Sequence, residues 1–460
     1  MGGINGKAGL WEALDMEDQG EFPGLPQRAE LNSVMEEAPG KARLASPERS
    51  QMKLVPMSLD ALLSAEHPAR MVWEFVQGCD LSSLYKEVRA VEGRAGRPAI
   101  DPALLLALWL YGLGDDVRSA RELERLCEES DAYRWLCGGV SVNYHTLSDF
   151  RAHSELFDVL LTQMLAVLTK EGILKGQRVA QDGMRIRASA GASSFHTKES
   201  LKAHLAAAEE RVKRAKESDR LPGVSERQRQ AAIRAAEERE QRVRRAQELL
   251  PQAEKALEDR SESKRKGEAR TSTTDPEARV MKMADGGFRP AYNGQFATDT
   301  ETTLIVGVDV TNVGSDMGQM PPMLKQVEAR LSKMPAEMLV DGGFPSAAAL
   351  ADAHALGVTV FAPVPRPRGE GAGIRDRYAP AKGDTPEKIA WRKRMATAEA
   401  QSIYRLRAAT AELVNARLRG YGLRALTVRG LKKVRAMLLL SALTHNIFRS
   451  QAIRMAAQAA

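Results

Sequence analysis

The amino-acid sequence predicts an α/β fold, a mixed sheet flanked by helices, that follows an all-helical N-terminal domain and is interrupted by a helical hairpin insertion. Apolar residues recur at helical spacing through residues 54–170. Beyond residue 276, apolar runs with strand character alternate with helical segments, the order typical of a sheet covered by helices. Between these parts, residues 196–270 combine 20 basic and 15 acidic side chains with helical apolar spacing and no aromatic residue.

The composition limits the class of protein. The chain has 460 residues, of which 43% are hydrophobic and 28% charged, so it can form about three domains at roughly 150 residues each and is not disordered throughout. Its three cysteines are an odd count with no signal peptide ahead of them, which excludes a disulfide-built secreted scaffold. The longest apolar runs, residues 103–111 and 437–443, fall short of the roughly 18 residues of a membrane helix. We expect a cytoplasmic protein.

The net charge of +7 is unevenly distributed. Residues 1–50 contain 5 basic and 9 acidic side chains, whereas residues 391–460 contain 14 basic and 2 acidic ones. The C-terminal excess alone is larger than the net charge of the whole chain. Such a block indicates an anionic partner, most often nucleic acid, although a solvated helix face is the alternative.

The N-terminal half is predicted to begin with a disordered tail, residues 1–53, rich in Gly, Pro and acidic residues. The helical domain, residues 54–170, has its expected helices at 70–78, 101–113, 118–127 and 146–169. Asp101 and Pro102 suit a helix start, and Ser119 with Glu122 has the spacing of a capping box. Arg94 and Arg97, in a Gly-rich turn, are candidate phosphate contacts or part of a solvated loop.

The sheet domain is predicted to comprise residues 171–195 and 276–450, with the charged helical insertion at 196–275 and a tail at 451–460. Residues 177–190 are expected to form a strand pair that turns at Asp182-Gly183. Further strands are expected at 292–299, 303–311, 337–341 and 358–364, and helices at 317–331, 346–356 and from about 386, with a stop at Gly420.

Three carboxylates are candidates for phosphodiester chemistry with Mg²⁺, which needs several hard oxygen ligands at one point. Asp182 and Asp341 each follow a short apolar strand and precede glycine, although Asp-Gly is also an ordinary turn. Asp285 and Asp309 are similar competitors. Glu412 is the only acid between Ala400 and Ala460, and Arg419, seven residues on, shares its helix face.

A zinc site is not expected from the cysteines and histidines. Cys127, Cys137, His145 and His153 follow each other at spacings that do not match compact zinc pairs. The cysteines are better interpreted as small core residues.

The order and spacing of several motifs resemble a known family over residues 54–449. In the helical domain these are residues 67–70 (HPAR), 93–98 (GRAGRP), 119–123 (SAREL) and 144–151 (YHTLSDFR). Downstream they are residues 181–183 (QDG), 187–190 (RASA), 292–295 (YNGQ), 341–344 (DGGF), Tyr404-x-x-Arg407 with Glu412, 429–430 (RG) and 445–446 (HN). With these motifs the chain resembles the bacterial insertion-sequence DDE transposases, which have a ribonuclease-H-like catalytic core.

The resemblance implies site residues and a cofactor. Asp182, Asp341 and Glu412 would be the catalytic triad that binds Mg²⁺, with Mn²⁺ as a substitute. Tyr404, Arg407 and Arg419 would assist at the transferred phosphate. Arg419 stands where this group usually has Lys, and Asn415 stands where an aromatic residue is common, which we expect to cost packing under the helix.

The resemblance also implies the reaction and the partners. Metal-activated water would cleave the element's ends, and the freed 3′-hydroxyl would attack target DNA. The helical domain would recognise the terminal inverted repeats, and a homodimer would hold two ends, bound to DNA at the bacterial nucleoid. The alternatives are an inactive, transposase-derived DNA-binding protein and a nuclease of the same fold without strand transfer.

Overall fold

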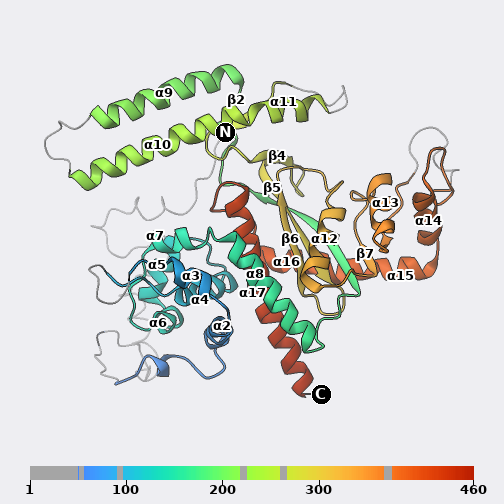
Figure 1. The fold of residues 1–460 in the computed structure, drawn as a ribbon, viewed down its shortest axis with the longest axis horizontal. Helices are drawn as coiled ribbons and strands as arrows, with labels where there is room; N and C mark the ends of the chain where they lie inside the picture. The colour runs from blue at the N-terminus through green and yellow to red at the C-terminus, as the bar shows by residue number, and fades with distance from the viewer. Residues whose placement is uncertain are drawn as a thin grey trace, which may run out of the picture. The chain divides into compact units, whose positions relative to one another are not determined.

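The computed structural model describes residues 50, 56–90, 97–217, 225–259, 267–366 and 376–459 (Figure 1). Arg94, and all but Ser50 of the predicted tail at 1–53, lie outside these ranges. The chain divides into two units, Met1–Met57 and Ser58–Ala460, and everything below concerns the second. In the described part, no helix is long and apolar enough to cross a membrane.

The N-terminal part of this unit is helical, as predicted. Its elements are the 3-10 turn η1 (Asp60–Leu62) and the helices α2 (Pro68–Gln77), α3 (Ser82–Glu87), α4 (Pro102–Gly114), α5 (Ala120–Glu129), α6 (Asp131–Cys137), α7 (Tyr144–Phe150) and α8 (Ser154–Lys170). Helix α4 is buried along nearly its whole length, so it is the centre around which the others pack. Asp101 caps it, accepting a hydrogen bond from the Ala103 N–H at 2.8 Å, and Pro102 occupies its first turn as expected.

Two expectations about these helices were wrong. Ser119 precedes α5, but its side chain accepts no capping hydrogen bond from any residue that the structure describes, so the capping box does not form. The helix expected at 146–169 is two helices, α7 and α8. A ring nitrogen of His153 lies 2.7 Å from the Phe150 carbonyl oxygen, and the His153 backbone leaves the helical region (ψ 63°), which separates them.

The sheet has six strands: β1 (Arg178–Arg187), β4 (Arg279–Lys282), β5 (Phe288–Asp299), β6 (Ile305–Thr311), β7 (Glu337–Leu339) and β8 (Thr359–Phe361). Their order is β4-β5-β1-β7-β8, and β6 also pairs with β5. β5 is antiparallel to β1 and β6, whereas β7 is parallel to β1 and β8. The sheet is therefore mixed, and β1, from before the insertion, is central to it. The predicted fold class is confirmed.

β1 corrects the expectation of a strand pair turning at Asp182-Gly183. It is one continuous strand, in which Asp182 pairs with Phe296 and Gly183 with Gln295 of β5. Glycine here serves close packing, since a Cβ at Gly183 would lie 2.2 Å from a carboxylate oxygen of Asp316. The prediction of a turn was wrong because glycine is favoured both in turns and where another chain segment packs closely against the backbone.

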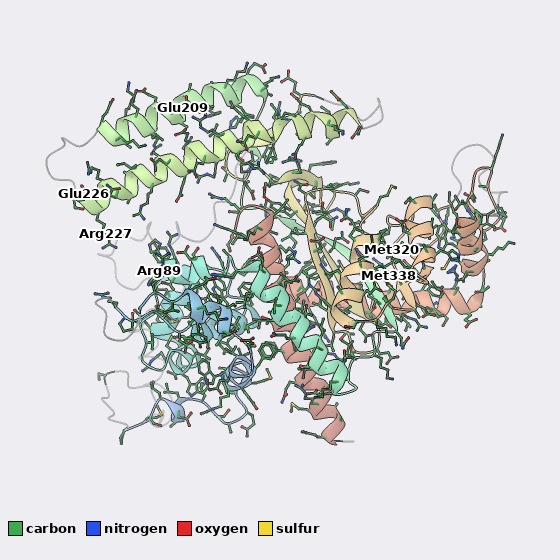
Figure 2. All side chains as sticks on the ribbon, in the orientation of Figure 1. Arg89, Glu209, Glu226, Arg227, Met320 and Met338 are labelled. Carbon is green, nitrogen blue, oxygen red and sulfur yellow. The ribbon has the colours of Figure 1, made fainter. Side chains whose placement is uncertain are left out.

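Residues between β1 and β4 form the predicted helical hairpin. A two-stranded sheet, β2 (Phe195–His196) with β3 (Thr271–Ser272), joins its ends. Helices α9 (Lys198–Glu217) and α10 (Glu226–Glu248) lie side by side, and α11 (Leu250–Glu258) follows (Figure 1). Charged side chains such as Glu209, Glu226 and Arg227 project along this arm (Figure 2). The break expected at 221–223 lies outside the described residues.

The C-terminal half supplies the helices that cover the sheet. These are α12 (Met320–Leu331), α13 (Ala347–Ala355), α14 (Pro386–Met395), α15 (Ala398–Arg407), the π-helical turn η5 (Ala408–Glu412), α16 (Leu413–Gly420) and α17 (Leu431–Ala459). The predicted stop at Gly420 is confirmed. α12 and α17 lie on opposite faces of the sheet, because Gly307 faces Met323 of α12 and Gly294 faces Leu438 of α17.

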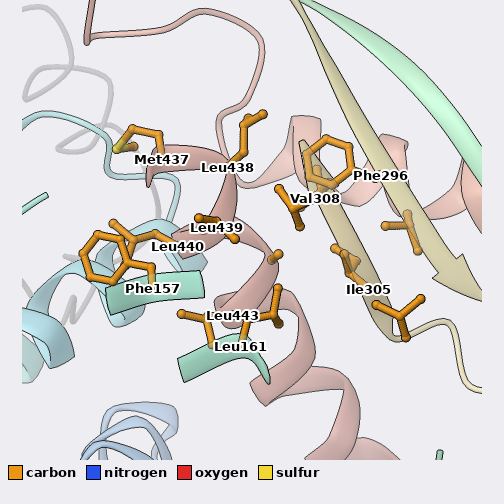
Figure 3. Close-up of a cluster of buried hydrophobic side chains, with 14 of the residues drawn as sticks. Phe157, Leu161, Phe296, Ile305, Val308, Met437, Leu438, Leu439, Leu440 and Leu443 are labelled. Atoms are coloured by element: carbon orange, nitrogen blue, oxygen red, sulfur yellow. The ribbon is translucent and has the colours of Figure 1, made fainter. Parts of the chain in front are cut away.

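Helix α17 joins the helical part to the sheet through one hydrophobic core. It contacts α4, α8 and β6. In Figure 3, Leu440 and Leu443 lie beside Phe157 and Leu161 of α8, while Leu438 lies toward Phe296 and Val308 of the sheet.

The His445-Asn446 pair of α17 fastens the start of β6. The Asn446 side chain accepts from the Ile305 N–H and donates to the Ile305 carbonyl oxygen, both at 2.8 Å. A ring nitrogen of His445 lies 2.9 Å from the Thr303 carbonyl oxygen. This motif of the sequence is therefore a structural clamp.

Candidate active site

Asp182 is held in the middle of β1 by three donors. Its Oδ1 accepts from Arg407 Nη2 at 2.8 Å and from the Gly183 N–H at 3.0 Å, and its Oδ2 accepts from Asn415 Nδ2 at 2.9 Å. The side chain is 18% exposed. Burial raises the pKa of Asp182, Arg407 opposes this and Asp341 adds to it, so the pKa lies above its ordinary value.

Asp341 reaches the same level of the sheet from the neighbouring parallel strand. Ala180 of β1 pairs with Leu339 of β7, and each aspartate follows its strand partner by two residues. Asp182 therefore lies within β1, and Asp341 follows the end of the adjacent strand β7 at the same height. The Gly343 N–H donates to Asp341 Oδ1 at 2.6 Å, so the Gly-Gly pair after Asp341 folds back on its carboxylate.

Glu412 comes from the π-helical turn η5 between α15 and α16. Its Oε1 accepts from Arg407 Nη1 at 2.7 Å, and its side chain is 54% exposed. The turn inserts a wider loop of backbone into an otherwise continuous helix, an irregularity frequent at functional sites. η5 contacts both β1 and β5, which brings Glu412 to the same side of the sheet as Asp182.

All three carboxylates raise the pKa of Arg407. Its side chain is only 9% exposed, and it bridges Asp182 and Glu412. Burial lowers the pKa of Arg407, but electrostatic interaction with Asp182, Tyr404, Asp341 and Glu412 outweighs burial and raises it. Burial also raises the pKa of Tyr404, with Arg407 opposing. The structure therefore brings together five of the residues expected at the site.

The remaining predicted residues are placed differently. Arg419 is exposed on α16, two helical turns after Glu412, and the ion-pair partner of Glu412 is Arg407. Arg97 is exposed just before α4, and Arg94 lies outside the described residues. The competitors have other partners: Asp285 pairs with Arg289 at 2.7 Å, and Asp309 lies 3.9 Å from Arg435.

Asn415 corrects the expectation of lost packing. It is buried, at 3% exposed, and its amide donates to Asp182. The sequence contained one indication of this contact: Asn415 is a polar residue on the helix face that carries the buried Val414 and Leu418. A polar residue in such a place needs a partner, and here that partner is the carboxylate.

The donor set has the chemistry of a magnesium site. Asp182, Asp341 and Glu412 offer carboxylate oxygens, the ligands that hard divalent ions prefer. Within the part of the chain that the structure describes, no three His, Cys, Asp or Glu side chains are grouped closely enough to hold a metal ion. The Arg407 guanidinium lies between two of the carboxylates and supplies the positive charge there.

Comparison with known proteins identifies two family matches along the chain. Residues 57–153 match the Transposase domain (DUF772), and residues 257–447 match the Transposase DDE domain. The second match includes Asp341 and Glu412, while Asp182 lies between the two matched segments. No curated protein and no solved structure gives a match. The chain therefore contains a transposase N-terminal domain ahead of a transposase DDE domain.

Proposed function

We propose that this chain cleaves DNA at the ends of a mobile element and transfers the freed 3′ ends to target DNA, in a reaction that needs divalent metal. The observation that supports this best is the bridge that Arg407 makes between Asp182 and Glu412, with Asp341 at the end of the strand next to that of Asp182. Hard oxygen donors beside a guanidinium suit a site where metal ions and a phosphodiester must both bind.

In this proposal the three carboxylates hold Mg²⁺, or Mn²⁺ in its place. When bound, the metal supplies an activated attacking oxygen and stabilisation of the leaving oxygen. Tyr404, whose pKa is raised by burial, stays protonated at neutral pH and can donate its hydroxyl proton to a phosphate oxygen. Arg419, exposed on α16, is free to contact the DNA backbone.

Arg407 has two roles in turn. Without metal, its guanidinium binds both Asp182 and Glu412 and offsets one of their two negative charges. If the carboxylates of Asp182 and Glu412 held a divalent ion, the Arg407 guanidinium would be free to bind the incoming phosphate. Arg can bind a phosphate through two parallel hydrogen bonds, so the released side chain orients the scissile group.

The N-terminal helices would recognise the terminal inverted repeats, with Arg97 and Arg94 as phosphate contacts. Two ends must be joined in one reaction, so a homodimer on DNA is expected. The basic block at residues 391–460 includes the helices that carry Arg407 and Glu412 and would bind the phosphates around the cleavage point.

The test is metal-dependent cleavage of a duplex that contains the DNA flanking the reading frame. Asp341→Asn should abolish cleavage in Mg²⁺. The matched control is Asp285→Asn, because Asp285 is also followed by two glycines but pairs with Arg289. Unchanged cleavage by Asp341→Asn would refute the triad.

Two alternatives give different products in the same assay. A wild-type protein that binds the duplex but never cuts it would be a DNA-binding protein only. A protein that cuts the duplex but yields no joined product with target DNA would be a nuclease of the same fold.

A further inference from the structure

The face of β1 opposite Asp182 contains a buried polar cluster. Alternate residues of a strand point to opposite faces, so Gln181, Gly183 and Arg185 face away from the three carboxylates. They pair across the sheet with alternate residues of β5, Gly183 with Gln295 and Arg185 with Asn293. We call Gln181, Asn293, Gln295 and Asp316 the reverse-face cluster; all four side chains are buried.

Asp316, in the segment between β6 and α12, is the centre of this cluster. Its Oδ1 accepts from Asn293 Nδ2 at 2.7 Å and from Gln295 Nε2 at 2.8 Å. Its Oδ2 accepts from Arg185 Nη2 at 3.2 Å. Asp316 is 8% exposed, and its partners are side chains of β1, which carries Asp182, and of the neighbouring strand β5.

Gly183 brings this carboxylate directly against the backbone beside Asp182. A Cβ at Gly183 would lie 2.2 Å from Asp316 Oδ1, 2.6 Å from Gln295 Nε2 and 2.9 Å from Asn293 Oδ1. No real side chain could occupy that position without moving the cluster. The motifs at residues 181–183 and 292–295 therefore pack together around the Asp316 carboxylate.

We propose that Asp316 is a positioning residue that fixes the segment of β1 from which Asp182 projects. Asp182 is one residue from Gly183, so a shift of the backbone at Gly183 moves the Asp182 carboxylate relative to Asp341 and Glu412. Metal ligands require placement to a fraction of an ångström, and loss of such supporting contacts weakens metal sites. The inference rests on the proposed function in taking Asp182 as a metal ligand.

The hydrogen bonds of Asp316 explain why its loss should displace β1. Removing the carboxylate leaves buried amides of Asn293 and Gln295 and the Arg185 guanidinium without this acceptor. Gln181 Oε1 and Asn293 Oδ1 already have no hydrogen-bond partner among the described residues, so the cluster has spare acceptors. The expected response is a rearrangement of amides around Gly183, because unsatisfied buried donors are costly.

Asp299 provides a matched control. It is also a buried carboxylate of the sheet, at 1% exposed, in the same strand as Asn293 and Gln295. Its Oδ2 accepts from the N–H and hydroxyl of Thr302, at 2.9 and 2.7 Å, within the turn between β5 and β6. Asp299→Ala thus removes a carboxylate of similar burial, but one that accepts these hydrogen bonds from a residue only three positions away in the chain.

The test uses the full chain with Mn²⁺ alone as the probe, bound ion being measured by the loss of the electron paramagnetic resonance signal of free Mn²⁺. Asp316→Ala should raise the Mn²⁺ dissociation constant by about 10- to 100-fold, as loss of an outer-shell partner does. Asp316→Asn should have an intermediate effect, because its amide oxygen can still accept from Asn293 and Gln295. On the flanking-DNA duplex, kcat should fall while KM changes by less than about threefold.

Wild-type Mn²⁺ affinity and kcat in a folded Asp316→Ala protein would overturn the proposal, as would an equal loss in Asp299→Ala. If Asp316→Ala does not fold, the same comparison is made with Asp316→Asn. If the wild type itself neither binds Mn²⁺ nor cuts DNA, the proposed function has failed. Hydrogen exchange of the β1 amides then decides: faster exchange at 181–184 in the Asp316 variant than in Asp299→Ala supports the positioning role of Asp316, and equal exchange refutes it.

Discussion

Arg407 and Asp182 form a nearly buried ion pair, with Nη2 2.8 Å from Oδ1, and the same guanidinium also binds Glu412. The positive charge between these two carboxylates is thus part of the chain. In the proposed function a divalent ion would take the place of this charge, so the stability of the protein would depend on metal loading.

Arg407→Gln should therefore destabilise the metal-free protein and increase its response to metal. Breaking a buried ion pair from one side leaves the other charge uncompensated, at a cost of about 3 kcal/mol. We expect a lower melting temperature in chelator and a larger rise on adding Mg²⁺ than the wild type shows. Arg405→Gln, which changes an exposed arginine of the same helix, is the control and should alter neither value. Equal Mg²⁺ responses in Arg407→Gln and wild type would contradict the competition.

Asn415→Leu should reduce catalysis more than stability. Leucine cannot donate to Asp182, and a hydrogen bond to a charged group contributes about 1.5–3 kcal/mol to stability. Burial of the apolar leucine side chain contributes a similar amount, about 1.5–3 kcal/mol, and offsets this loss. We expect kcat for cleavage to fall at least tenfold, while the midpoint of urea unfolding changes little. A variant with wild-type kcat would show that Arg407 and the Gly183 N–H suffice to orient Asp182.

The sequence was sufficient to predict the fold class because the helices and the strands each have their own spacing of apolar residues. It also predicted that Asp341 follows a strand and that Glu412, an isolated acid in a basic region, lies on a helix, as the structure shows. It did not show that Asp182 lies inside a strand, because the reason for Gly183 is the carboxylate of Asp316, distant in sequence. Asn415 was misjudged for the same reason, since its partner lies on another element.

The free energy of unfolding should depend on pH because His445 is buried. Burial lowers the pKa of His445 from 6.5 to about 4. The unfolded chain therefore binds a proton at this site between pH 6.5 and pH 4 while the folded protein does not. Stability is complete above pH 6.5 and is lost as the pH falls toward 4, by about 3 kcal/mol for a shift of this size. Urea unfolding of wild type and His445→Gln at pH 7 and pH 5 checks this: the wild type should lose more stability between the two. Parallel losses would assign the acid sensitivity to other groups.

Glu412→Gln should separate catalysis from folding. The Glu412 side chain is 54% exposed, so its ion pair with Arg407 is in contact with water, and such pairs contribute about 0–1 kcal/mol. The glutamine amide keeps the shape of the side chain, and Arg407 keeps its bond to Asp182. Unfolding should thus be nearly unchanged, whereas a neutral amide is a poor ligand for Mg²⁺ and cleavage should fall by at least 100-fold. Glu399→Gln, at the other acid of the basic C-terminal block, is the control and should cleave normally. A Glu412→Gln protein that cuts the flanking-DNA duplex at the wild-type rate would remove Glu412 from the triad, even if Asp182 and Asp341 proved essential.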